Sequence, residues 1–162
     1  MAVLPAGLAR GHRSNPAASL RIQLLYGAPK LLSGLSSQIL SLAEKKILHQ
    51  HYKQSLERLQ RLHKATPEAV VQFLGGSLLL TGLLELRQIN LLGMISRLDP
   101  SNILHRLAVV TLSIPKRSSR SWFLQVRDLC AKYSIADPLT ILSSPPTKYS
   151  FNRTAKSRII DF

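Results

Sequence analysis

The side chains that could bind a metal ion or act as nucleophiles are few and scattered. His49 and His51 are the closest pair of ligand-type residues, but a spacing of two places them on different faces of a helix, whereas helical metal ligands are four apart. Cys130 is the only cysteine, so neither an intramolecular disulfide nor a multi-cysteine zinc site can form. We therefore expect no metal ion and no other cofactor, and we interpret both histidines as exposed polar residues.

Motifs for catalysis are missing from the sequence as well. Gly75-Gly76 is not followed by the glycine and lysine of a phosphate-binding loop. The eight acidic residues are dispersed, without the Asp-Asp dipeptide that binds the two metal ions of a polymerase. We identify no catalytic residue, and an independent enzyme activity is the least supported function.

The charge of the chain is strongly one-sided. Its 162 residues contain 22 Lys and Arg against 8 Asp and Glu, a formal net charge of +14. Such an excess favours polyanionic partners, with nucleic acid first and an anionic membrane surface second. The alternative is a basic domain whose charge is balanced elsewhere in a larger protein.

Basic residues are concentrated towards the C-terminus. From residue 115 onward there are nine Lys and Arg against three Asp, a net charge of +6. A basic linker over 115–120 precedes Trp122, and a basic helix ends the chain. A linker of this kind beside a rigid helix could clamp phosphates, although a solvated surface would explain the same residues. The residues predicted to contact phosphates are Lys116, Arg117, Arg120, Lys148, Arg153, Lys156 and Arg158.

Trp122 has two interpretations. An exposed indole could stack on a nucleic-acid base. However, Trp122 shares its helical stripe with Val126 and Leu129, which favours packing in the core.

The elements that position these residues are all predicted to be helices. No period-two strand pattern and no repeat is present. We predict an all-α fold of about seven helices in an irregular array around a central apolar helix at 77–98. Its apolar run is broken at Glu85, Arg87 and Gln88, too early for a membrane span.

Local signals define the other helices. The chain from 16 to 40 forms two short helices, or one helix kinked at Gly27–Pro29. Ser41 begins the next helix, in which Glu57 and Arg61 are spaced to form an ion pair. Further starts are predicted at Thr66-Pro67-Glu68, at Ser101 and at Asp137-Pro138. The apolar stripe expected on the helix after Ser41 comprises Ile47, Leu48, Tyr52, Leu56, Leu59 and Leu62, and the helix after Ser101 carries Ile103, Leu104, Leu107 and Val110.

Residues 1–15 are expected to form an irregular leader. They lack the apolar core of a secretory signal, so we expect an intracellular protein, cytoplasmic or nuclear. Arg10, Arg13 and Arg21 precede the first acidic residue, Glu44, which leaves a mitochondrial protein as an alternative.

Five blocks of sequence carry a family resemblance. In order, they are LYGAPKLLSGL, LQRLHKATPEAVVQFLGG, LRQINLLGMISRL, SWFLQVRDLC with KYSIADPLTIL, and PPTK with SF. Together they resemble the C-terminal region of LINE-type (non-LTR) retrotransposon reverse transcriptases, over roughly residues 16–162. In that family this region follows the catalytic palm of an RNA-directed DNA polymerase.

The resemblance implies a fragment without catalytic residues, because the endonuclease, fingers and palm would lie upstream. It implies thumb-like helices at 16–40, where Arg21 and Lys30 would face RNA or an RNA–DNA hybrid. A helical core at 41–114 and a basic C-terminal helical segment at 115–162 would follow. The missing palm and fingers would be a packing partner. A competing hypothesis is a helical protein–protein interaction module, with the apolar face of the 78–92 helix exposed.

Overall fold

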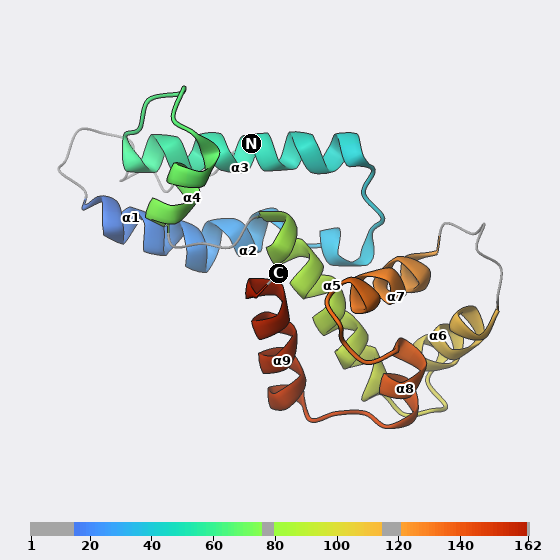
Figure 1. Cartoon of the computed structure of the whole chain (residues 1–162). Helices are drawn as coiled ribbons and strands as arrows, with labels where there is room; N and C mark the ends of the chain where they lie inside the picture. Colours follow the sequence, from blue (N-terminus) through green and yellow to red (C-terminus); the bar gives the residue numbers. More distant parts are fainter. Residues whose placement is uncertain (1–14, 76–79, 115–120, 162) are drawn as a thin grey trace. The chain divides into compact units, whose positions relative to one another are not determined.

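The computed structural model describes residues 15–75, 80–114 and 121–161, and the regular secondary structure of these residues is all helical (Figure 1). Seven of the α-helices have seven residues or more, and the described residues contain no strand. The predicted all-α fold of about seven helices is therefore confirmed, whereas the predicted leader lies outside these ranges, residue 15 excepted. The α-helices are α1 (Pro16–Ile22), α2 (Ala28–Leu31), α3 (Leu42–Gln60), α4 (Glu68–Gly75), α5 (Leu80–Ser96), α6 (Ile103–Ser113), α7 (Trp122–Lys132), α8 (Pro138–Ser143) and α9 (Lys148–Ile160).

Two compact units make up the chain. One comprises Met1–Ser33 and Leu42–Leu80, and the other comprises Gly34–Ser41 and Thr81–Phe162. Residues of the predicted 41–114 core contribute to both units. None of the described helices is both long and apolar enough to span a bilayer.

The first unit begins with one continuous helical path. Between α1 and α2 a π-helical turn spans Gln23–Gly27, and the Ala28 N–H donates to the Gln23 carbonyl. Pro29 has no N–H to offer the preceding turn, and a locally widened turn accommodates it. The predicted kink at Gly27–Pro29 is thus a π turn within a helix that packs on α3.

Helix α3 differs from its prediction in one of its buried positions and in its ion pair. Tyr52 and Leu56 are buried as expected, but Ile47 is 57% exposed. The Glu57 carboxylate pairs with Lys53, 3.4 Å away, and not with Arg61. The reason is that Arg61 has left the helix, with a φ of 55°.

The turn at Arg61, which ends α3, is a Schellman motif. The Leu62 N–H donates to the Glu57 carbonyl at 2.9 Å, and the Arg61 N–H donates to the Arg58 carbonyl at 3.3 Å. The predicted cap of α4 is also different: the Thr66 hydroxyl donates back to the His63 carbonyl.

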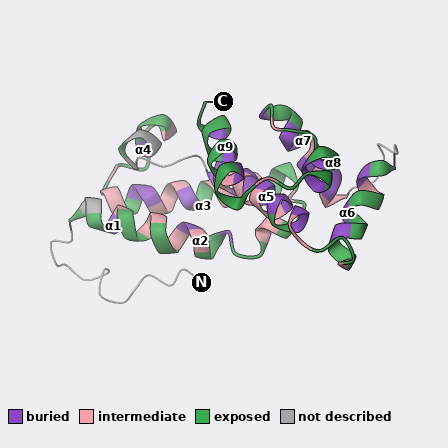
Figure 2. Ribbon diagram, turned by 90° about the horizontal axis from the view of Figure 1, so that it is seen from below, coloured by how far each residue is buried: buried purple, intermediate pink, exposed green. Residues whose placement is uncertain are grey.

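The second unit is built around α5, as predicted for the central apolar helix. Leu84, Ile89 and Leu92 of α5 are buried, so the apolar face expected to be open in an interaction module is covered (Figure 2). The first cluster that packs on α5 joins α7, α8 and α9, and the second joins α6, α7 and α8. The buried members of the first are Ile89, Leu92, Val126, Leu129, Cys130, Tyr133, Ile141, Phe151, Ala155 and Ile159, and those of the second are Ile95, Ala108, Leu112, Phe123 and Leu142.

Caps define the shorter helices of this unit. The Asp137 carboxylate accepts from the Leu139 N–H at 3.0 Å, which confirms the predicted start of α8. For α6 the cap is Asn102, whose side-chain oxygen accepts from the Leu104 N–H at 2.9 Å. Ser101 was expected in that role, but its hydroxyl and N–H both donate to Asp99.

Candidate nucleic-acid interface

Helix α9 is held on α5 by one face. Phe151, Ala155 and Ile159 are buried at spacings of four, as expected for one side of a helix. Gly93 of α5 leaves room for the Phe151 ring, since a Cβ at this glycine would lie 2.5 Å from ring carbons. The buried face of α9 fixes which of its side chains point to solvent.

Four of the predicted phosphate-binding residues lie together on α9. Lys148, Arg153, Lys156 and Arg158 are all exposed. None of them takes part in the ion pairs found among the described residues, which involve other cations. In this part of the chain, therefore, α9 presents four charges that salt bridges do not neutralise.

The other predicted cations are distributed differently. Arg21 on α1 and Lys30 on α2 are exposed, but both belong to the first unit. Lys116, Arg117 and Arg120 lie outside the described residues. The structure thus brings together the four α9 residues, while the clamp around 115–120 remains a prediction.

Trp122 is partly buried and packs against the core, as the sequence favoured. Its indole N–H donates to the Ser36 carbonyl at 2.7 Å, and its ring contacts the apolar clusters of the second unit. Phe123 lies edge-on to it, with 5.1 Å between ring centroids. These contacts engage the ring and its polar atom, so base stacking by Trp122 gains no support here.

The structure contains a buried polar cluster that the sequence did not predict. Glu85 of α5, which is 9% exposed, accepts hydrogen bonds from the Tyr133 hydroxyl and from Lys132 Nζ, the latter at 3.0 Å. The ammonium group also lies 4.6 Å from the Tyr133 ring centroid. The only signal in the sequence was an acid inside an apolar run.

The role of this cluster is structural. Burial is the main influence on Tyr133 and raises the pKa of its hydroxyl, and the hydrogen bond to Glu85 raises it further. For Lys132, burial opposes the charged form, but hydrogen bonds to Tyr133 and Glu85 outweigh it and raise the pKa of the ammonium group. Both side chains therefore keep their protons at neutral pH and tie α7 to α5.

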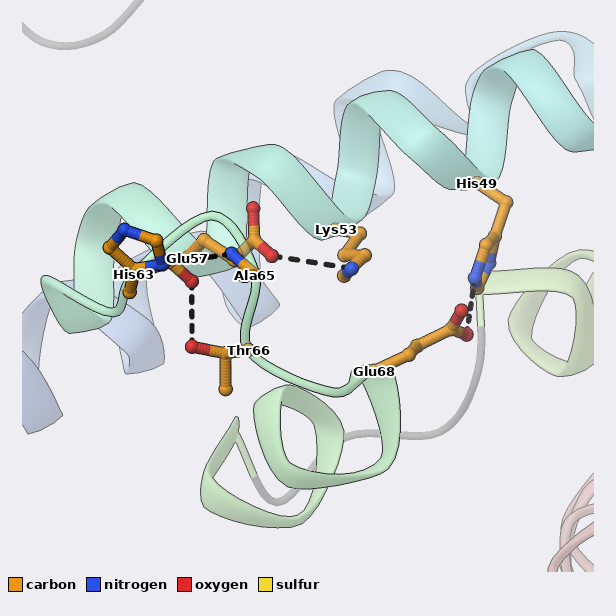
Figure 3. Close-up of polar contacts among 7 residues, drawn as sticks. All are labelled: His49, Lys53, Glu57, His63, Ala65, Thr66 and Glu68. Atoms are coloured by element: carbon orange, nitrogen blue, oxygen red, sulfur yellow. Dashed lines mark hydrogen bonds and ion pairs between the residues drawn. The ribbon is translucent and has the colours of Figure 1, made fainter.

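The two histidines of α3 have different surroundings. Figure 3 shows His49 of α3 directed at Glu68 of α4, and its Nε2 donates to that carboxylate. His49 is thus half-buried, which corrects its interpretation as an exposed residue, while His51 is exposed. No group of three or more potential metal ligands occurs among the residues described.

An open groove lies between α6 and α8 in the second unit. It encloses about 410 Å³, and its lining residues are His105, Val109, Leu139, Thr140, Leu142 and Ser143. The Ser143 hydroxyl donates to the Thr140 carbonyl at 3.0 Å. His105 is the only ionisable residue of this lining.

Neither a protein-family model, nor a curated protein, nor a solved structure matches this chain. Its function must therefore be argued from its own residues.

Proposed function

We propose that this chain binds nucleic acid, either RNA or an RNA–DNA hybrid, through phosphate contacts from exposed basic side chains. The observation that carries the proposal is the set of four unneutralised cations on α9. Cations that are free of salt bridges can replace the counterions condensed on a phosphate backbone without first breaking a bond within the protein.

The origin that fits this proposal is the C-terminal region of a LINE-type reverse transcriptase without its palm. The ordered sequence blocks support it, together with the all-helical fold that such a region would require. The genomic sequence upstream of the Met1 codon tests the origin. A palm-coding sequence there with an Asp-Asp motif would support the origin, whereas unrelated sequence with a promoter would favour a recruited gene.

Binding is tested by titrating a fluorescently labelled RNA and an RNA–DNA hybrid with the protein between 50 and 200 mM salt. Affinity should fall steeply as salt rises, because each phosphate contact contributes about 0.7 to 0.9 to the slope of log K against log salt. Changing Lys148, Arg153, Lys156 and Arg158 together to Gln should make that slope shallower by about 3, because four phosphate contacts are lost. An affinity that does not change with salt would rule out phosphate contacts.

A charge-matched control shows whether α9 is the interface. Lys46, Arg58, Lys64 and Arg106 are exposed outside α9, and changing them to Gln removes the same net charge. This control should retain most of the affinity. An equal loss in both variants would indicate non-specific attraction and would contradict an interface on α9. The double variant Arg21→Gln/Lys30→Gln tests the thumb-like contribution in the same assay.

A second candidate function, a helical protein–protein interaction module, is favoured by α6. Ile103, Leu107 and Val110 of α6 recur at spacings of four and three, and each is between 51% and 79% exposed. That spacing places them on one side of the helix, where a partner helix could pack.

Light scattering coupled to size-exclusion chromatography tests this second function. Self-association that Leu107→Glu abolishes would support it, with Leu42→Glu as the control because Leu42 lies on another helix, α3, and is 87% exposed. A monomer that binds RNA would favour the first function instead.

A further inference from the structure

One face of α9 combines an aromatic ring with two cations. Tyr149, Arg153, Lys156 and Ile160 follow one another at spacings of four, three and four. This spacing places them on one side of the helix, and that side is opposite the buried Phe151, Ala155 and Ile159. All four are exposed, Tyr149 to 77% and Ile160 to 55%.

Tyr149 differs from most other large rings of the described chain. Tyr52 and Tyr133 are buried, and Trp122 is engaged by Ser36. Tyr26 is exposed, but it lies in the first unit, where one cation, Lys30, follows four residues later. Tyr149 therefore offers an open ring face beside two charges on the same helix face.

The charge of α9 is also poorly explained by helix stability. Lys148 occupies the first turn, and no acidic residue balances it there. A cation close to the positive end of the helix dipole is unfavourable, whereas an anion at this end is favourable. An anionic ligand near this end of α9 would relieve that repulsion.

From these observations we propose that the Tyr149 face of α9 binds unpaired nucleotides. Tyr149 stacks on a base while Arg153 and Lys156 contact the phosphates that flank it. The inference rests on the nucleic-acid binding proposed above and narrows its ligand to a single strand. In a duplex the base faces are occupied by neighbouring base pairs, so only an unpaired base can cover the ring.

A membrane surface fits this face less well. A helix that lies in a bilayer needs a continuous apolar face, and the apolar face of α9 is already buried against α5. Arg153 and Lys156 also separate Tyr149 from Ile160 along the helix, so they interrupt the apolar surface.

The test compares Tyr149→Ala and Tyr149→Phe for binding to a labelled oligo(U), an oligo(dT) and a duplex of the same length. Tyr149→Ala should weaken single-strand binding about 5- to 150-fold, as expected for one stacked base, and should change duplex binding by less than about twofold. Tyr149→Phe keeps the ring and should bind as the unaltered chain does. Tyr26→Ala is the matched control and should have no effect. The oligo(U) and oligo(dT) arms show whether the strand is RNA or DNA.

The outcomes separate this inference from the proposed function. Loss of salt-dependent binding in the four-cation variant, with no effect of Tyr149→Ala, would overturn the stacking inference and leave the proposed function intact. An equal loss on single strands and duplexes would also overturn it. If the chain bound phosphatidylserine vesicles but no oligonucleotide, both proposals would fail. Circular dichroism should show unchanged helix content, because Tyr149 does not pack in the core.

Discussion

The hydroxyl of Tyr133, just after α7, donates a hydrogen bond to the carboxylate of Glu85 on α5, 48 positions earlier in the chain. The same oxygen of Glu85 also accepts from Lys132 at 3.0 Å. These bonds satisfy an acid that the surrounding apolar residues would otherwise leave without solvation.

Tyr133→Phe should therefore destabilise the second unit. Removing the hydroxyl deletes a hydrogen bond to a charged group, which costs about 1.5–3 kcal/mol. Urea unfolding followed by circular dichroism measures the change. The matched control is Tyr26→Phe, the same substitution at an exposed ring, which should change the free energy of unfolding by less than about 0.5 kcal/mol. Equal effects would mean that the Glu85 bond adds no stability.

Two glycines of α5 should respond in opposite directions to alanine. At Gly93 a Cβ would lie 2.5 Å from the Phe151 ring, whereas at Gly82 it would lie 3.5 Å from Ile159, an ordinary contact. Gly93→Ala should destabilise by about 1–3 kcal/mol through overpacking. Gly82→Ala should stabilise by about 0.5–1 kcal/mol, because alanine is the better helix former. Thermal melts of both variants test the packing of α9 on α5, and a shift of the same sign in both would contradict it.

Ser134→Gly should stabilise the chain. Ser134 ends α7 with a φ of 52°, and the Ile135 N–H closes the turn on the Cys130 carbonyl at 2.8 Å. Left-handed backbone costs a non-glycine residue about 1–2 kcal/mol, which exceeds the roughly 0.4–1 kcal/mol that glycine adds in unfolded-chain entropy. Ser144→Gly is the control, since its φ of −134° needs no glycine, and it should destabilise. Chemical denaturation of the two variants should show opposite signs.

The periodicity of apolar residues predicted where the helices lie better than it predicted which of their residues are buried. The apolar run of α5 correctly indicated a central helix, and Asp137-Pro138 correctly indicated the start of α8. In α6, however, apolar residues lie on several sides of the helix. Their spacing located the helix but did not show that His105, Ala108 and Leu112 are its buried residues.

The sequence could not show which side chains contact one another. Glu57 has a basic residue four positions away in both directions, Lys53 and Arg61. It pairs with Lys53 because the chain makes a left-handed turn at Arg61, and no glycine in the sequence signals this turn. Contacts between distant segments, such as Phe151 with Gly93, depend on tertiary packing. For the proposed interface, the charge in the sequence indicated the basic helix, but exposure was needed to distinguish Trp122 from Tyr149.

The thiol of Cys130 should be unreactive in the folded chain. Cys130 is 1% exposed, and burial raises the pKa of its thiol to about 12, with a smaller contribution from Asp137. Only the thiolate reacts with disulfide reagents. We expect negligible labelling by a chromogenic disulfide at pH 8 and one rapid equivalent after unfolding in guanidinium. Rapid labelling of the folded chain would contradict the buried position of this residue.

The same thiol should make stability depend on alkaline pH. Its pKa rises from 9.0 to about 12 on folding, so the folded state retains a proton that the unfolded state loses. Stability must then decrease as pH rises above 9, and the loss amounts to about 1.4 kcal/mol between pH 8 and pH 10. Urea unfolding of the chain and of Cys130→Ala at both pH values isolates this contribution, because other titrating groups are common to both proteins. The free-energy difference between the two should shift by that amount in favour of Cys130→Ala, and a constant difference would show that Cys130 titrates alike in both states.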